Sequence, residues 1–169
     1  MKKRIIIITI ITFVTCLLIW RFWPHSFSSI IPVDVNSVIS FSACTSVAYV
    51  EDGEPYIDTY CLDISQQQDD SIEEIIKILE ASEYQQDYRN ILPWSIDYVD
   101  TDRNFDGHTA TLLFVFGNKK DDCISIQFLS RSIIIVSIRE EPGFRIFHPT
   151  NPETLYDLVE YFQTYGAMQ

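Results

Sequence analysis

The densest group of metal-type ligands in the sequence is an acidic loop at positions 97–107. Its oxygen-bearing side chains alternate as in the first half of a calcium-binding loop, where every second residue turns toward one hard cation. The matching residues are Asp102, Asn104 and Asp106, followed by Gly107. The match ends there, because the twelfth position is Leu113 instead of a bidentate glutamate. The loop is therefore either a calcium site or a polar turn whose backbone is set by Asp106-Gly107.

The cysteines offer a second kind of chemistry, a cross-strand disulfide. Two strand-like segments flank Asp52-Gly53, and Asp-Gly is a strong signal for a two-residue turn with positive φ at both positions. Around such a turn the numbers of opposed residues sum to 105, so Cys44 faces Cys61. The same register opposes two glutamates beside the turn, which is unfavourable. The alternatives are a disulfide in an oxidising compartment and two buried thiols.

Catalytic arrangements are harder to find in this chain. Cys123 with His108 or His148 forms a nucleophile–base pair only if the fold brings the two side chains together. The cysteines and histidines lack zinc-type spacing, and the sequence contains no serine-hydrolase, metalloprotease, phosphate-loop or kinase motif. The sequence therefore favours a non-enzymatic protein without a cofactor, calcium apart.

Aromatic residues near the end of the first expected helix form a candidate contact patch. They are Tyr84, Tyr88 and Trp94. Tyrosine and tryptophan are enriched at protein interfaces because they combine apolar area with a polar tip. The alternative is that these side chains belong to the core or to a face of the sheet.

The N-terminal segment predicts how the domain is held. Residues 5–20 carry no charge, and the apolar stretch extends to Trp23, which gives 19 residues. A helix of that length can cross a bilayer with little tilt, and the basic residues before it favour a cytoplasmic N-terminus. We expect a retained anchor over residues 1–23. The alternatives are a cleaved signal peptide, although small residues before a cut are missing, and lipidation at Cys16. All three place the following domain on the outer side of the membrane.

Beyond the anchor, charge limits the choice of partners. Four of the 12 basic residues precede Pro24, so the rest of the chain has eight basic and 24 acidic residues and a net charge of −16. Such a domain repels nucleic acid, which excludes DNA and RNA as partners. We expect a tether at residues 24–32 and one domain at residues 33–169.

The periodicity of apolar residues predicts an α+β domain with two layers. Helices with one apolar face are expected at residues 71–88 and 152–165. Strands are expected at 38–50, 56–62, 94–99, 108–116, 122–129, 132–138 and 144–147. Short connections favour a mainly antiparallel sheet, and the two amphipathic helices must pack on it to bury their apolar faces. The uninterrupted apolar run at 133–136 is typical of a central strand.

Together these features predict a bacterial, membrane-anchored extracytoplasmic domain that binds a partner without catalysis. The expected contacts are the membrane, through residues 5–23, and a membrane or envelope protein. A calcium-responsive domain using the loop at 97–107 is one alternative. An exported hydrolase with an unrecognised site is the other.

Overall fold

A computed structural model describes residues 2–31, 37–64, 70–91, 107–116, 123–138 and 143–169 of the chain. The helices are α1 (Lys2–Phe22), α2 (Phe27–Ile30), α3 (Asp70–Glu80), the 3-10 helix η2 (Tyr88–Ile91) and α4 (Thr154–Tyr165). The strands are β1 (His25–Ser26), β2 (Val38–Glu51), β3 (Glu54–Ile64), β4 (Glu83–Gln86), β5 (His108–Phe116), β6 (Cys123–Ser130), β7 (Ile133–Ile138), β8 (Arg145–Pro149) and β9 (Ala167–Met168).

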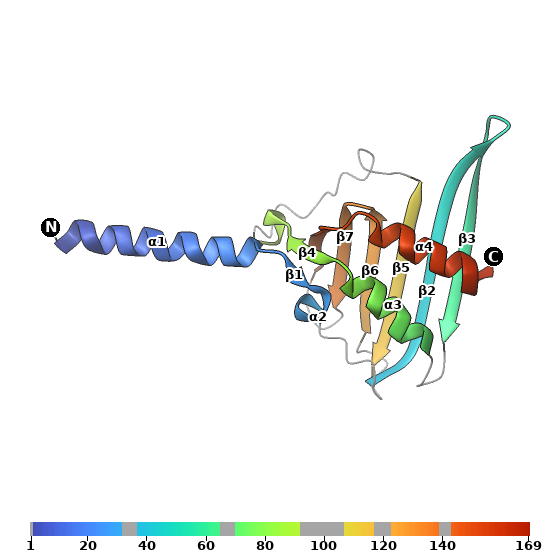
Figure 1. Ribbon diagram of the computed structural model, residues 1–169, viewed down its shortest axis with the longest axis horizontal. Coiled ribbons are helices and arrows are strands. Elements are labelled where there is room, and N and C mark those ends of the chain that lie inside the picture. Colours follow the sequence, from blue (N-terminus) through green and yellow to red (C-terminus); the bar gives the residue numbers. More distant parts are fainter. Residues whose placement is uncertain (1, 32–36, 65–69, 92–106, 117–122, 139–142) are drawn as a thin grey trace.

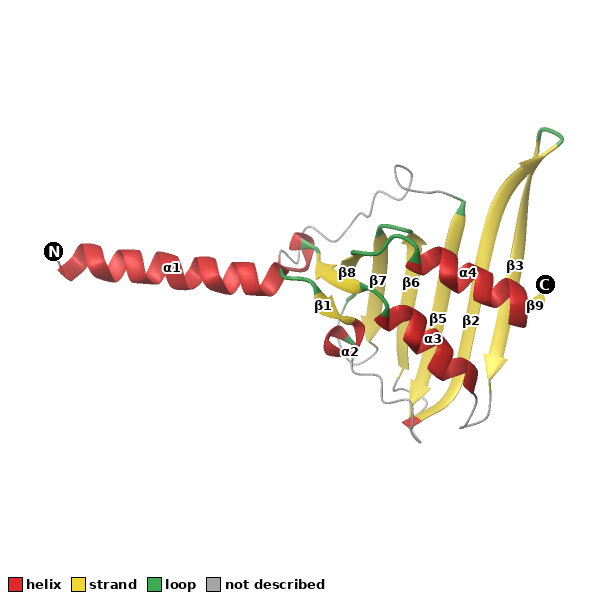
Figure 2. Ribbon diagram, in the orientation of Figure 1, coloured by secondary structure: helices red, strands yellow, loops and turns green. Residues whose placement is uncertain are grey.

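All the described strands belong to one sheet, in the order β1-β4-β8-β7-β6-β5-β2-β3-β9. Each neighbouring pair is antiparallel, which confirms the sheet type predicted from the short connections. Helices α3 and α4 lie across one face of the sheet (Figure 2). The predicted strand at 94–99 lies outside the described residues.

The core lies between helices α3 and α4 and the face of the sheet that they cover. Leu158 and Phe162 of α4 are fully buried there, as are Phe114 of β5 and Ile126 of β6. Each such side chain contributes about 1.5–3 kcal/mol by leaving water. The expected central strand is β7, which has β6 on one side and β8 on the other. Apolar burial on one face of a broad sheet thus supplies the main stabilisation.

The first amphipathic helix is shorter than predicted. Helix α3 ends at Glu80, and residues 83–86 form strand β4 instead of two further helical turns. In β4 the Tyr84 side chain is fully buried, and its hydroxyl donates a hydrogen bond of 2.8 Å to the carbonyl of Leu79 near the end of α3. Pairing of β4 with β8 supplies the backbone hydrogen bonds that a longer helix would have made.

The segment expected as a tether also differs from the prediction. Residues 25–30 form β1 and the short helix α2, and the side chains of Phe27 and Ile31 are buried in the core. The Ser28 amide donates a hydrogen bond of 2.8 Å to the Glu80 carboxylate at the end of α3. The segment that follows α1 is therefore packed against the domain.

The second amphipathic helix, α4, ends at Tyr165, as predicted, and Gly166 follows it. Gly166 has φ −81°, so it is not in the left-handed conformation that usually ends a helix at glycine. A Cβ at this position would lie 2.6 Å from the carbonyl oxygen of Phe162 and 3.2 Å from that of Cys61. Glycine is required because the chain passes close to two backbones on its way into β9.

Helix α1 projects away from the sheet as a single rod (Figure 1). Its segment Arg4–Phe22 has a mean hydropathy of 2.4 and none of it is buried in the protein. At 1.5 Å per residue its 19 residues span roughly 28 Å, close to the thickness of a bilayer core. The helix is therefore long enough and apolar enough to cross a membrane.

Candidate functional site

The strongest candidate for an interaction site is the end of the β2–β3 hairpin, residues 48–58, called the hairpin tip below. Four large apolar or aromatic side chains are exposed there: Tyr49 (39%), Val50 (72%), Tyr56 (47%) and Ile57 (69%). The rings of Tyr49 and Tyr56 stack with centroids 5.8 Å apart. Clustered apolar groups that stay exposed in the folded chain are typical of contact surfaces.

The apolar groups of the hairpin tip lie on both faces of a two-stranded ribbon. Tyr49 is opposite Tyr56, while Val50 is opposite Pro55 on the other face. Among the described residues, pairing of β2 with β5 ends at Val47. Beyond that point β2 and β3 pair, within the described part of the chain, only with each other. A ribbon of this kind has no apolar layer to cover either face, and Figure 1 shows it extending past the neighbouring strands.

A rim of carboxylates surrounds these apolar side chains. Residues 48–58 contain four acidic residues and no basic residue: Glu51, Asp52, Glu54 and Asp58. The Tyr49 hydroxyl donates a hydrogen bond of 3.4 Å to Asp58. Desolvation and the negative charge of Asp58 both raise the pKa of the Tyr49 phenol, so this phenol stays a neutral donor at physiological pH. The hairpin tip therefore presents an apolar centre with an acidic border.

The turn that closes the hairpin tip has the predicted geometry. Asp52 and Gly53 both have positive φ, 53° and 87°, as a type I′ turn requires. The predicted register is also found, with Glu51 opposite Glu54 and Cys44 opposite Cys61. Such a turn fits the right-handed twist of the strands, and it fixes which side chains lie on each face of the ribbon.

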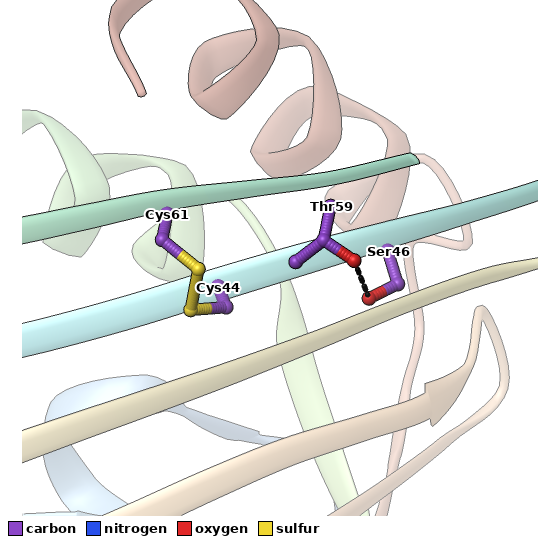
Figure 3. The surroundings of a disulfide bond; sticks show 4 residues. All are labelled: Cys44, Ser46, Thr59 and Cys61. Carbon is purple, nitrogen blue, oxygen red and sulfur yellow. Dashed lines mark hydrogen bonds between the residues drawn. A yellow bond between two sulfur atoms is a disulfide. The ribbon is translucent and has the colours of Figure 1, made fainter. Parts of the chain in front are cut away.

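A covalent link lies below the hairpin tip. The sulfur atoms of Cys44 and Cys61 are 2.05 Å apart and form a disulfide between β2 and β3 (Figure 3). Two residues closer to the tip, the hydroxyls of Ser46 and Thr59 make a hydrogen bond of 3.1 Å on the same face. These two links hold the strands in register where they leave the sheet. The hairpin tip is therefore presented from a braced base.

The ribbon also meets the start of β5 closely. The Ala48 amide donates a hydrogen bond of 2.6 Å to the carbonyl of Gly107. Gly107 has φ +87°, and a Cβ on it would lie 2.7 Å from the Ala48 carbonyl oxygen. Glycine therefore satisfies both the backbone conformation and the close contact, as the turn interpretation of Asp106-Gly107 requires at its second residue.

A second cluster, at the opposite part of the sheet, surrounds the buried carboxylate of Asp87. Asp87 Oδ1 accepts hydrogen bonds from the Arg89 backbone amide (2.7 Å) and Nε (2.9 Å), and Oδ2 accepts one from Nη2 (2.8 Å). His148 Nε2 lies 2.7 Å from the same Oδ2. Burial raises the pKa of Asp87, but the bonds from Arg89 and His148 outweigh that effect and lower the pKa to about 2. The carboxylate is therefore ionised at every physiological pH.

This cluster has an aspartate–histidine pair but not the geometry of a catalytic one. In a triad, one ring nitrogen faces the carboxylate and the other faces the nucleophile. Here His148 Nδ1 lies 2.7 Å from the Ser132 carbonyl oxygen, which is an acceptor and not a nucleophile. Both ring nitrogens thus face acceptors, and neither faces a nucleophile. The cluster ties β4, β7 and β8 together.

The proposed cysteine–histidine pairs are not brought together. His108 and Cys123 lie at opposite ends of the β5–β6 pair, because Cys123 is opposite Val115. Seven residues along a strand cover roughly 23 Å. His148 is near Ser132 at the start of β7, whereas Cys123 is beside the end of that strand. Neither His108 nor His148 can therefore act as a base for Cys123 in this fold.

The structure contradicts the contact patch predicted from aromatic residues at Tyr84. Tyr84 is wholly buried beside Phe27, with ring centroids 5.9 Å apart, because it anchors β4 to α3. Tyr88 is 63% exposed at the start of η2, and Trp94 lies outside the described residues. Tyr84 therefore cannot belong to an exposed patch with Tyr88.

The calcium ligands predicted in the acidic loop, Asp102, Asn104 and Asp106, also lie outside the described residues. Within the parts of the chain that the structure describes, no three histidine, cysteine or acidic side chains gather as a metal site would require. The geometry of the described residues thus supports a contact surface before any other kind of site.

Comparison of the chain with protein-family models, with curated proteins and with solved structures finds no match.

The sequence itself indicates the hairpin tip, although no motif marks it. With the register fixed by Asp52-Gly53, consecutive apolar residues stand on both strands next to the turn, Tyr49-Val50 and Tyr56-Ile57. A half-buried strand alternates apolar and polar residues. Two consecutive apolar pairs in one hairpin place apolar groups on both faces, and a ribbon cannot bury both.

Proposed function

We propose that the protein is a membrane-anchored extracytoplasmic domain that binds another envelope protein through its hairpin tip, without catalysis. The observation that supports this proposal best is the exposed apolar cluster on a ribbon that is braced at its base. Aromatic residues surrounded by polar ones are the usual composition of an interface centre and its rim. The anchor raises the local concentration of the domain near membrane-bound partners.

Charge defines the partner more closely. Four carboxylates and no basic residue border the apolar centre, so the complementary surface has an apolar pocket with lysine or arginine around it. A second copy of this chain is disfavoured, because two acidic tips would repel each other. An anionic membrane surface is disfavoured for the same reason. A protein with a basic rim fits both the charge and the apolar area.

Photo-crosslinking in intact membranes tests this proposal. A photoreactive amino acid replaces Ile57 in the full chain, and in the control it replaces Glu74, which is exposed on α3. We expect one discrete product from position 57 and none from position 74. The product should contain an envelope protein, weaken at high salt, and disappear when Tyr49 and Tyr56 are both changed to alanine.

Three results would contradict the proposal. A product of twice the chain mass would assign the hairpin tip to self-association. Crosslinks to lipid alone would assign it to the membrane. Equal products from positions 57 and 74 would show that the hairpin tip is not a specific surface.

A further inference from the structure

A cavity of about 390 Å³ lies where α1 meets the domain. Its lining comes from several elements and includes Arg21, His25, Gln86, Asn90 and Arg145. Arg21 is near the end of α1, and Arg145 is at the start of β8, so residues far apart in sequence form the same cavity. The volume is sufficient for a small polar ligand.

The described residues that line this cavity carry the opposite charge to the domain. Two arginines line it, and among the described residues no aspartate or glutamate does, although the chain beyond the anchor carries a net charge of −16. Arginine forms bidentate hydrogen bonds with phosphate and carboxylate oxygens. The amides of Gln86 and Asn90 and the ring of His25 add polar groups to the lining. Such a lining suits an oxyanion.

The walls of the cavity are held by hydrogen bonds. Asn90 donates through Nδ2 to the Ile146 carbonyl (2.6 Å) and accepts through Oδ1 from the Ile146 amide (2.8 Å), which fixes η2 to β8 beside Arg145. His25 packs edge-on against Trp20 of α1, with ring centroids 6.2 Å apart. Hydrogen bonds thus hold the domain side of the cavity, and an aromatic contact joins it to the helix side.

The position of the cavity along α1 limits which ligands can reach it. Trp20 and Trp23 are 67% and 63% exposed on either side of Arg21, and tryptophan and arginine at a helix end mark the headgroup level of a bilayer. If α1 spans the membrane as proposed above, the cavity opens among the lipid phosphates. We infer that Arg21 and Arg145 bind a phosphate group in this cavity, at the depth of the lipid headgroups.

The same chemistry would accept an anionic phospholipid or a free phosphate, and two measurements separate them. The full chain is placed in nanodiscs of phosphatidylcholine with or without phosphatidylglycerol, and native mass spectrometry counts the lipids that remain bound. We expect one retained phosphatidylglycerol per chain. In parallel, inorganic phosphate is titrated into the chain in pure phosphatidylcholine while tryptophan fluorescence is followed.

Charge-neutral variants identify the residues. Arg145→Gln and Arg21→Gln should each lower retention of phosphatidylglycerol about tenfold, because each removes a charge-assisted contact. Arg145→Lys should recover part of the retention. Lys77→Gln removes the same charge from an exposed position on α3 and should have no effect. Arg21 lies on α1, outside the core of the domain, so its variant remains informative if Arg145→Gln fails to fold.

Each outcome decides the matter. Retained phosphatidylglycerol that depends on the arginines supports a lipid headgroup, and a fluorescence response to phosphate alone supports a soluble phosphate. Equal retention of both lipids together with no response to phosphate overturns the proposal. If carbonate extracts the chain from membranes, the proposed anchor fails, but the phosphate titration on the extracted chain still tests the cavity. Loss of crosslinking at the hairpin tip leaves this result unaffected.

Discussion

Asp87 shows how one buried carboxylate organises the sheet next to α1. Its side chain is 3% exposed, and Arg89 of η2 and His148 of β8 compensate its negative charge. An ionised group in such a place is costly unless it is fully hydrogen-bonded. The three side chains therefore act as a unit, and the consequence of losing one of them can be measured.

The free energy of unfolding should depend on pH through this residue. The pKa of Asp87 falls from 3.8 to about 2 on folding, so the folded state binds the proton more weakly than the unfolded state. The resulting stability is fully present above about pH 4 and is lost as the pH falls through about 2. The loss amounts to about 2 kcal/mol, measurable by urea unfolding of the full chain in detergent.

Asp87→Asn provides the matching variant. It should lower the free energy of unfolding at neutral pH by about 3 kcal/mol, because it leaves Arg89 and His148 without their charged acceptor. It should also remove the acid dependence between pH 4 and 2. Asp63→Asn, at an exposed position of β3, should change neither. An unchanged acid dependence in Asp87→Asn would refute the assignment to this carboxylate.

Among the elements, the β2–β3 hairpin depends on local and covalent determinants together. Its disulfide joins residues 17 positions apart, and closing a loop of that size in the unfolded chain contributes about 3 kcal/mol in the chain-entropy model. The same link holds the base from which the exposed ribbon extends. Removal of the disulfide should therefore affect both stability and the presentation of the hairpin tip.

The prediction is that changing Cys44 and Cys61 together to serine lowers the free energy of unfolding by about 3 kcal/mol. Cys123→Ser is the control, because Cys123 is not in a disulfide. Mass spectrometry of intact chain, with and without reduction, should find one internal disulfide. Equal stability of the double variant and the parent chain would mean that the link contributes nothing.

The elements also show what the sequence could and could not reveal. The hairpin register was predictable because Asp52-Gly53 fixes it within a few residues. Strand β4 was not, because its pairing joins Tyr84 to Pro149 across 65 positions of the chain. A tyrosine after an amphipathic helix fits more helix equally well, so only the distant partner strand decides. The cavity between Arg21 and Arg145 depends on the same nonlocal pairing, and no motif marks it.

Helix α1 and the hairpin tip lie at opposite sides of the sheet. Strand β1, next to α1, and strand β3 are separated by six others in the sheet order, which corresponds to roughly 34 Å at the usual strand spacing. Figure 1 shows α1 leaving from one side and the hairpin at the other. In the proposed arrangement the acidic hairpin tip is held away from the membrane, where a protein partner can reach it.

The orientation of this assembly connects the proposals. In the proposed orientation the basic N-terminus stays in the cytoplasm, and the domain, its disulfide and the hairpin tip face the outside, where oxidising conditions would maintain the link. The cavity beside Arg21 then opens toward the outer leaflet. Each of these statements fails if the domain faces the cytoplasm.

A dual reporter fused behind Gln169 tests the orientation most directly. The reporter combines alkaline phosphatase, active only outside the cytoplasm, with β-galactosidase, active only inside it. We predict high phosphatase and low galactosidase activity in a bacterial host, with the fusion in the membrane fraction. High galactosidase activity without phosphatase activity would place the domain in the cytoplasm and contradict the account.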